Sequence, residues 1–158
     1  MSGSMLNPRR RFSNVAKRWT LLLAVSLLAV LGCDRNKGVT HGIDTQVRAG
    51  ATAVNLTQVA DFDWDRLFVF GPYSYPEGMC KDLGFSSREC SAAALKDVDE
   101  GDFLLVFLTD GTITHRETFS RLKGNFDRGC LGKAIPRADA RLAIDRSEGG
   151  VVYLVCRR

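Results

Sequence analysis

The most regular pattern of apolar and polar residues lies in the second half of the chain. Residues 103–108 are continuously apolar, as expected for a strand that is covered on both faces. Asp110-Gly111 follows, a pair that is favoured in type I′ β-hairpin turns. The return strand alternates, and one of its faces carries Ile113, His115, Glu117 and Phe119. Because threonine and arginine occupy the other face, the pattern predicts a return strand that is half exposed or at a sheet edge.

Shorter patterns predict the remaining elements. A helix is expected from Pro76 to Leu83, because proline suits the first turn of a helix and Gly84 follows the last. The other apolar stretches that favour short strands are 53–56, 67–70, 139–144 and 151–156. Residues 124–136, which come directly before the third of these stretches, predict a loop.

These elements predict a small α+β domain. About five strands joined by short turns imply mostly antiparallel pairing in one sheet. One short helix cannot cover both faces of that sheet, so three solutions are open: a second helix within residues 91–96, a sheet that curls on itself, or sheet packed on sheet. We expect an α+β domain with one or two short helices in preference to a closed barrel.

The first third of the chain has a different pattern. Arg9-Arg10-Arg11 and Lys17-Arg18 precede an uncharged apolar run over residues 19–31, and Gly32-Cys33 follows. The run is shorter than the roughly 20 residues of a transmembrane helix and is typical of a signal peptide. The whole order resembles a bacterial lipoprotein signal peptide with the processing box Val30-Leu31-Gly32-Cys33, although this family usually has a smaller residue in place of Leu31.

The resemblance implies that residues 1–32 are removed and that Cys33 carries acyl chains such as palmitate, which would hold the protein on a lipid bilayer. A plain secretory signal and a short signal anchor are the alternatives. Asp34 resembles an inner-membrane retention signal, so the resemblance implies an inner-membrane lipoprotein whose domain faces the periplasm. The polar, glycine-punctuated residues 33–50 predict a flexible tether, and a single domain is expected over residues 51–158.

Charge and cysteine content change the picture of the mature chain. Five of the 22 Lys and Arg residues precede Cys33, so 17 remain against 18 Asp and Glu, a net charge of −1. A nucleic-acid partner is therefore not expected, because it would require a basic surplus. Four cysteines remain and allow three pairings, of which the local ones, Cys80–Cys90 and Cys130–Cys156, are favoured. No cofactor or metal is expected, because the chain has no C-x-x-C and only two histidines, His41 and His115.

The most distinctive segment of the mature chain is Asp61-Phe62-Asp63-Trp64-Asp65, followed by a strand and the turn Pro72-Tyr73. It resembles a pattern in small uncharacterised bacterial envelope lipoproteins, which combine a Trp-Asp pair, a hydrophobic strand, a Pro-Tyr turn and a short helix ending near Leu-Gly. The resemblance implies no particular activity. The residue types favour a buried Trp64 with aspartates that cap turns; an exposed interface of Asp63, Trp64, Asp65 and Tyr73 is the alternative.

The function expected from these features is that of a membrane-anchored envelope lipoprotein that acts without catalysis, as a binding, accessory or inhibitor/immunity-type module for an envelope protein partner. The alternative is an envelope hydrolase that uses His115 and Glu117 or the Asp61–Asp65 cluster, although no nucleophile motif such as G-x-S-x-G is present. Arg116, Arg121 and Lys123 form a modest basic cluster, which we expect to be a solvated face; contact with acidic lipid headgroups or a partner is the alternative.

Overall fold

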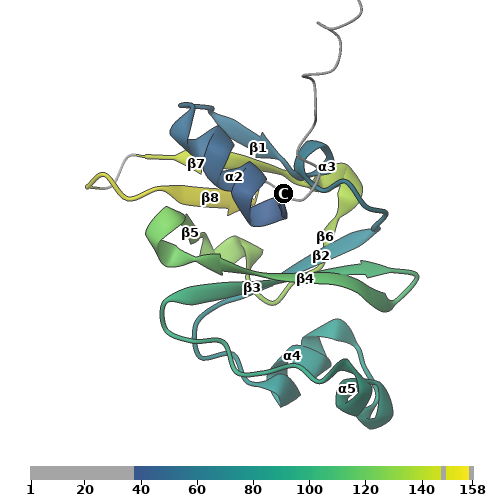
Figure 1. The fold of residues 1–158 in the computed structure, drawn as a ribbon. Helices are drawn as coiled ribbons and strands as arrows, with labels where there is room; N and C mark the ends of the chain where they lie inside the picture. Colours follow the sequence, from purple (N-terminus) through teal and green to yellow (C-terminus); the bar gives the residue numbers. More distant parts are fainter. Residues whose placement is uncertain (1–37, 147–148, 157–158) are drawn as a thin grey trace, which may run out of the picture. The chain divides into compact units, whose positions relative to one another are not determined.

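The computed structural model describes residues 38–146 and 149–156 (Figure 1). Chain contacts divide the protein into two units, Met1–Asp34 and Arg35–Arg158, and the fold given below is that of the second unit. The predicted signal peptide, residues 1–32, and the predicted lipidation site Cys33 lie outside the described residues.

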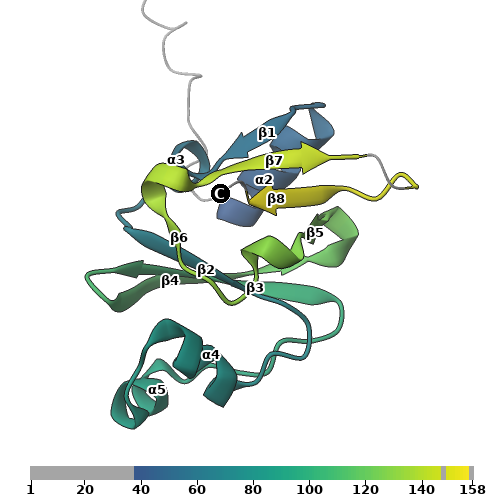
Figure 2. The ribbon, with the colours of Figure 1, turned by 180° about the vertical axis from the view of Figure 1, so that it is seen from behind.

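Two sheets of four strands each form the framework of the second unit (Figures 1 and 2). The sheet that we call the central sheet is fully antiparallel and has the order β4 (Thr112–Ser120), β3 (Asp102–Thr109), β2 (Arg66–Phe70) and β6 (Ile135–Pro136). The other, which we call the outer sheet, has the order β1 (Ala53–Asn55), β7 (Arg141–Asp145), β8 (Tyr153–Cys156) and β5 (Asn125–Phe126). Only its β5–β8 pair is parallel.

Helices cover these sheets on two sides. The central sheet lies between the outer sheet and a layer of two helices, α4 (Pro76–Leu83) and α5 (Ser87–Ala93) (Figure 1). Helix α2 (Val39–Arg48) contacts β1, β4 and the short helix α3 (Leu56–Val59). Three single-turn 3-10 helices complete the connections: η1 (Arg121–Lys123), η2 (Arg128–Cys130) and η3 (Arg137–Asp139).

Strand β3 is buried on both faces, as its continuous apolar sequence predicted. Phe103, Leu105 and Phe107 belong to the core between the two sheets. Val106 and Leu108 point the other way and belong to a second core under α4 and α5. The α+β fold class with mostly antiparallel strands is thus confirmed, and the cover for both faces comes from a second sheet together with a second helix. The sheet of about five strands is in fact two sheets.

The hairpin and the first predicted helix are confirmed in detail. Asp110 and Gly111 both have positive φ, 49° and 78°, as a type I′ turn requires. Strand β4 lies at the edge of the central sheet and is exposed on alternate residues. Helix α4 begins at Pro76 and ends before Gly84, which adopts the left-handed conformation with φ of 75°. The second helix, expected within residues 91–96, instead begins at Ser87.

The expected flexible tether over residues 33–50 is wrong for most of its length. Residues 39–48 form α2, in which Val39 and Ile43 are fully buried in the core between the sheets. Val39, Ile43 and Val47 follow a spacing of four residues, which places them on one face of a helix. Gly42 obscured this pattern, because glycine disfavours helices; here its missing side chain lets Val59 approach closely. The domain therefore begins before residue 51.

Both predicted disulfides are present. The Cys80–Cys90 bond joins α4 to α5 and fastens the helix layer. The Cys130–Cys156 bond joins η2 to β8, and the Cys130 side chain is fully buried. Each bond therefore closes a local loop.

Candidate functional site

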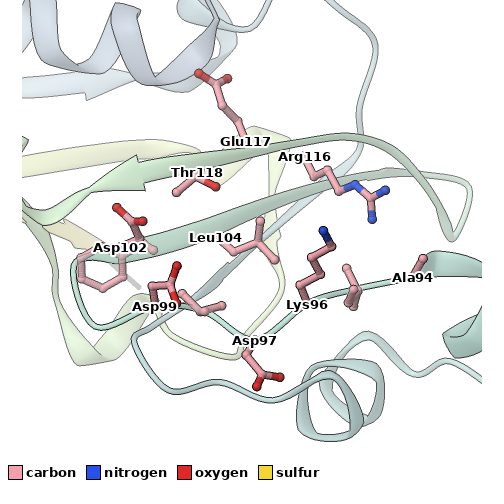
Figure 3. Close-up of a pocket in the computed structure, with 12 residues that line it drawn as sticks. Ala94, Lys96, Asp97, Asp99, Asp102, Leu104, Arg116, Glu117 and Thr118 are labelled. Carbon is pink, nitrogen blue, oxygen red and sulfur yellow. The ribbon is translucent and has the colours of Figure 1, made fainter.

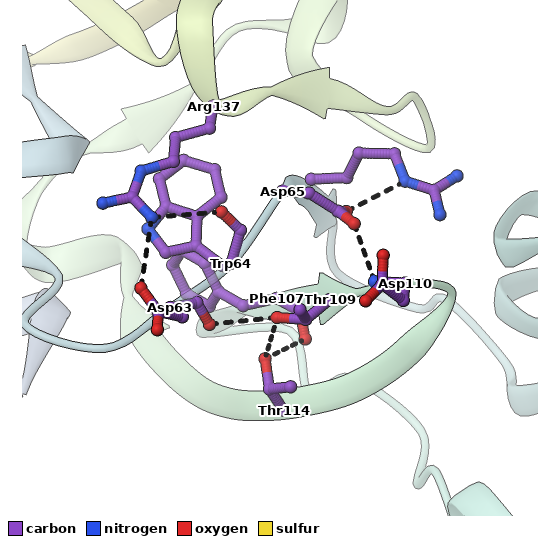
Figure 4. A network of polar contacts seen from close by, with 9 residues as sticks. Asp63, Trp64, Asp65, Phe107, Thr109, Asp110, Thr114 and Arg137 are labelled. Carbon is purple, nitrogen blue, oxygen red and sulfur yellow. Dashed lines mark hydrogen bonds and ion pairs between the residues drawn. The ribbon is translucent and has the colours of Figure 1, made fainter.

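The Asp61–Asp65 segment leads directly into β2 and places its tryptophan inside the domain (Figure 4). Trp64 is only 3% exposed and contacts Phe107 edge-to-face, with 5.3 Å between ring centroids. Phe62 is half-buried and packs against the same ring. The interpretation of Trp64 as a core residue is confirmed, and the alternative that placed it in an exposed interface is wrong, since its ring fills the space between the sheets.

The aspartates of this segment do not converge on a common site. Asp65 accepts a hydrogen bond from the Asp110 backbone N–H at 2.7 Å and one from Arg66 Nε at 3.1 Å (Figure 4). The Asp110 bond, followed by the Arg66 guanidinium, lowers the pKa of Asp65. Asp63 is fully exposed, and its Oδ1 lies 3.8 Å from Nη1 of Arg137. The Asp65–Asp110 bond fixes the β3–β4 hairpin to the start of β2, whereas Asp63 faces Arg137 of η3.

His115 and Glu117 do lie together, with 3.3 Å between Nε2 and Oε2. The other oxygen of Glu117, Oε1, accepts a hydrogen bond from the Thr40 backbone N–H at 3.0 Å and a second from the Thr40 hydroxyl. Glu117 of β4 thus caps the first turn of α2, which has no cap from its own Gly38. Although burial opposes ionisation, hydrogen bonds from Thr40, His115 and Val39 outweigh it and lower the pKa of Glu117.

The imidazole of His115 also packs against an aromatic ring. Its ring lies 4.5 Å from that of Phe62, measured between centroids. The aspartate segment and the His115–Glu117 pair, the two alternatives for a hydrolase site, are therefore joined by the contact between Phe62 and His115. The carboxylate of Asp65 is hydrogen-bonded to the hairpin, and that of Glu117 is hydrogen-bonded to α2. This arrangement gives Glu117 a structural role that the sequence did not predict.

A cleft of about 460 Å³ opens between the β3–β4 pair and the segment that joins α5 to β3 (Figure 3). Its apolar lining comes from Leu95, Val98, Phe103 and Leu104. Lys96 and Arg116 stand on one side, whereas Asp99 and Asp102 stand on the other (Figure 3). The Glu117 carboxylate points away from the cleft, toward the opposite face of β4 (Figure 3). The cleft thus carries cations at one side and anions at the other.

Most of these charges have no partner of their own. Within the described residues, the side chains of Lys96, Asp99 and Asp102 form neither an ion pair nor a hydrogen bond. Arg116 is held in place because its Nη1 donates to the Ala93 carbonyl at 2.6 Å, at the end of α5. Sequence patterns did not indicate this site, because Arg116 was expected to lie on a solvated face. The one local signal is the charge-rich stretch 96–102 that precedes a buried strand.

Like Asp63, Tyr73 in the Pro-Tyr turn is a residue of the predicted interface that does lie on the surface. Tyr73 and Tyr75 are 60% and 61% exposed. Tyr73 has a φ of 63°, and its backbone N–H donates to the Val98 carbonyl at 2.8 Å. Partial desolvation and a hydrogen bond with Glu100 raise the pKa of Tyr73. The backbone therefore holds this side chain outward in a conformation that non-glycine residues rarely adopt.

Comparisons with protein families, curated proteins and solved structures found no match to this chain. Among the described residues, no helix is long and apolar enough to cross a membrane. The same part of the chain contains no group of three or more histidine, cysteine or acidic side chains arranged to hold a metal ion.

Proposed function

We propose that this protein is a membrane-anchored lipoprotein of the bacterial envelope that acts as a non-enzymatic binding module, with the cleft beside β4 as its binding site. The observation that carries the proposal is that charges of both signs, unpaired among the described residues, Lys96 on one side and Asp99 and Asp102 on the other, flank an apolar lining. Charges that the fold does not use remain available to a ligand, whereas Asp65 and Glu117 are already hydrogen-bonded within the domain.

The chemistry of the cleft favours a polypeptide partner. A protein segment can offer a carboxylate to Lys96 and an ammonium or guanidinium group to the aspartates of the cleft. Its apolar side chains can pack on Leu104. The anchoring part of the proposal is supported by the basic and apolar leader that ends at Cys33. Two disulfides support an oxidising compartment such as the periplasm.

A photocrosslinking amino acid at Thr118, an exposed residue that lines the cleft, tests the binding site in intact envelope membranes. We expect one crosslinked product of defined mass, and we expect Lys96→Glu to abolish it. Lys81→Glu makes the same change of charge on α4, outside the cleft lining, and should leave the product unchanged. Repeated absence of a product, or a product that is insensitive to Lys96→Glu, would refute the site.

The anchor has a separate test. Mass spectrometry of protein extracted from membranes should show an N-terminal Cys33 that carries acyl chains, with residues 1–32 removed. An unmodified Cys33 would refute lipidation and would leave the binding-site proposal untouched, because the cleft is built from residues 94–118 alone.

A further inference from the structure

The large apolar side chains that remain exposed in the described part of the chain gather at one end of the two sheets. They are Leu122 at 99% exposure, Tyr75 at 61%, Tyr73 at 60% and Val151 at 40%. Each lies in a connection that follows β2, β4 or β7, and these connections share the left end of the domain in Figure 1 and the right end in Figure 2. The opposite end, at the β3–β4 hairpin, carries none of them.

A hydrogen-bonded turn keeps the side chain of Leu122 exposed. It is the middle residue of η1, between Arg121 and Lys123. Its backbone N–H donates to the Ser120 hydroxyl at 3.4 Å, which caps the turn. Arg121 donates from Nη1 to the Glu100 carbonyl at 3.1 Å and from Nε to Asn125 at 3.0 Å. These bonds fix the backbone on both sides of Leu122, so its exposure is a property of the fold.

Tyr73 belongs to the same surface. Pro72, the residue before Tyr73, lines the same hollow as Arg121, and Arg121 donates to the Glu100 carbonyl. Tyr75 lies two residues further along the same connection and is equally exposed. An exposed leucine between two cations and two exposed tyrosines thus lie in neighbouring connections, and we call this set of residues the η1 patch: Tyr73, Tyr75, Arg121, Leu122 and Lys123.

We propose that the η1 patch binds the lipid bilayer, as a second membrane contact of the protein beside its acyl anchor. The composition matches the interface of a membrane: leucine gains from entering the acyl region, tyrosines prefer the headgroup level, and arginine and lysine attract anionic headgroups. This inference rests on the proposed anchoring through Cys33, which places a bilayer near the patch.

The chain length allows both contacts at once. Gly38 lies against the Glu117 carboxylate, and the five residue steps from Cys33 to Gly38 span at most about 18 Å. Glu117 to Leu122 is also five steps, or roughly 16 Å at the rise of a strand. Because α2 begins at Val39, the domain cannot stand far from the membrane, and the η1 patch is within reach of the same bilayer surface.

Tryptophan quenching in vesicles tests the proposal with the acylated mature protein. After removal of the leader, Trp64 is the only tryptophan and is buried. Leu122→Trp, reconstituted in vesicles of phosphatidylcholine and phosphatidylglycerol with brominated acyl chains, should lose about twofold more fluorescence than Arg88→Trp, the matched exposed position on α5. Lys123→Glu, or vesicles without phosphatidylglycerol, should remove the difference.

The failure of this proposal is distinct from failure of the anchor. Flotation of the vesicles and the mass of Cys33 report whether the acyl chains hold the protein on the bilayer. If they do and Leu122→Trp is quenched no more than Arg88→Trp, the η1 patch does not bind lipid, and an interface for another protein is indicated. Equal quenching in neutral and anionic vesicles would overturn the role of Arg121 and Lys123.

Discussion

Replacement of Glu117 by glutamine would test whether one carboxylate of β4 holds α2 on the domain. The wild-type side chain, 20% exposed, accepts two hydrogen bonds from Thr40 and contacts His115 through its other oxygen. Glutamine keeps an acceptor for Thr40 but loses the negative charge. Charge-assisted hydrogen bonds contribute about 1.5–3 kcal/mol against about 0.5–1.5 kcal/mol for neutral ones, and the charge at a helix N-terminus adds about 0.3–1 kcal/mol.

Glu117→Gln should therefore lower the free energy of unfolding by about 1–2 kcal/mol, and Glu117→Ala by about 2–3 kcal/mol because both Thr40 donors lose their partner. Urea titration of the mature domain, followed by the fluorescence of the buried Trp64, measures the change. With a urea dependence of about 1–3 kcal/mol per molar, the midpoint for Glu117→Gln should fall by roughly 1 M. Glu77→Gln, in the exposed first turn of α4, is the control and should stay within about 0.5 kcal/mol.

The pH dependence gives this prediction a second readout. The folded-state pKa of Glu117 is lowered, so its contribution is complete above the unfolded-state value of about 4.3 and is lost as the pH falls through the folded pKa. The deficit of Glu117→Gln should therefore be present at pH 7 and should vanish at low pH, where the wild-type side chain is also neutral. A wild-type midpoint for Glu117→Gln at pH 7, or a deficit that is unchanged at low pH, would refute the assigned cap.

Three further changes test the packing. In a free helix Gly42→Ala would be stabilising by about 0.5–1 kcal/mol, but here the new Cβ would lie 2.7 Å from Cβ of Val59. We therefore expect the free energy of unfolding, measured by urea titration, to fall by about 1–3 kcal/mol; an increase would contradict the docking of α2. Trp64→Ala should cost about 3–5 kcal/mol, whereas Trp64→Phe should cost less than about 1.5 kcal/mol, because Nε1 of this buried ring has no hydrogen-bond partner among the described residues. Calorimetry that finds equal losses would show that the indole N–H matters. Removing the Cys130–Cys156 pair should cost about 3.5 kcal/mol and removing Cys80–Cys90 about 2.7 kcal/mol; the reverse order in denaturation would argue against loop entropy as the cause.

Elements whose signal is local were predictable from the sequence. The β3–β4 hairpin follows from a continuous apolar run and Asp110-Gly111, and α4 follows from Pro76 and Gly84 at its ends. A local signal for α5 was also present, since Ser86 and Glu89 form a capping box. That capping box predicts a helix start at Ser87, whereas the helix was expected further along, within residues 91–96.

Elements defined by distant partners were not predictable. Strands β5 and β6 have two residues each and acquire their conformation from β8 and β2, so no periodicity marks them. The cleft likewise requires α5, the 94–102 segment and β4 to meet, and Arg116 faces it only because the helix layer covers that face of the sheet. The sequence shows which residues are charged, but which charges face one another depends on tertiary contacts between distant segments.

The outer sheet has a consequence for how the chain folds as it is synthesised. The central sheet and the helix layer are built almost entirely from the continuous stretch 66–120, so they can form while later residues are still being added. The outer sheet joins Val54 to Leu142, and β8, the last strand, supplies the partner of β5. Until β7 and β8 are made, the apolar face of the central sheet lacks part of its cover, and such long-range closure is intrinsically slow. The domain is therefore most exposed to aggregation and proteolysis in the period before β8 is synthesised.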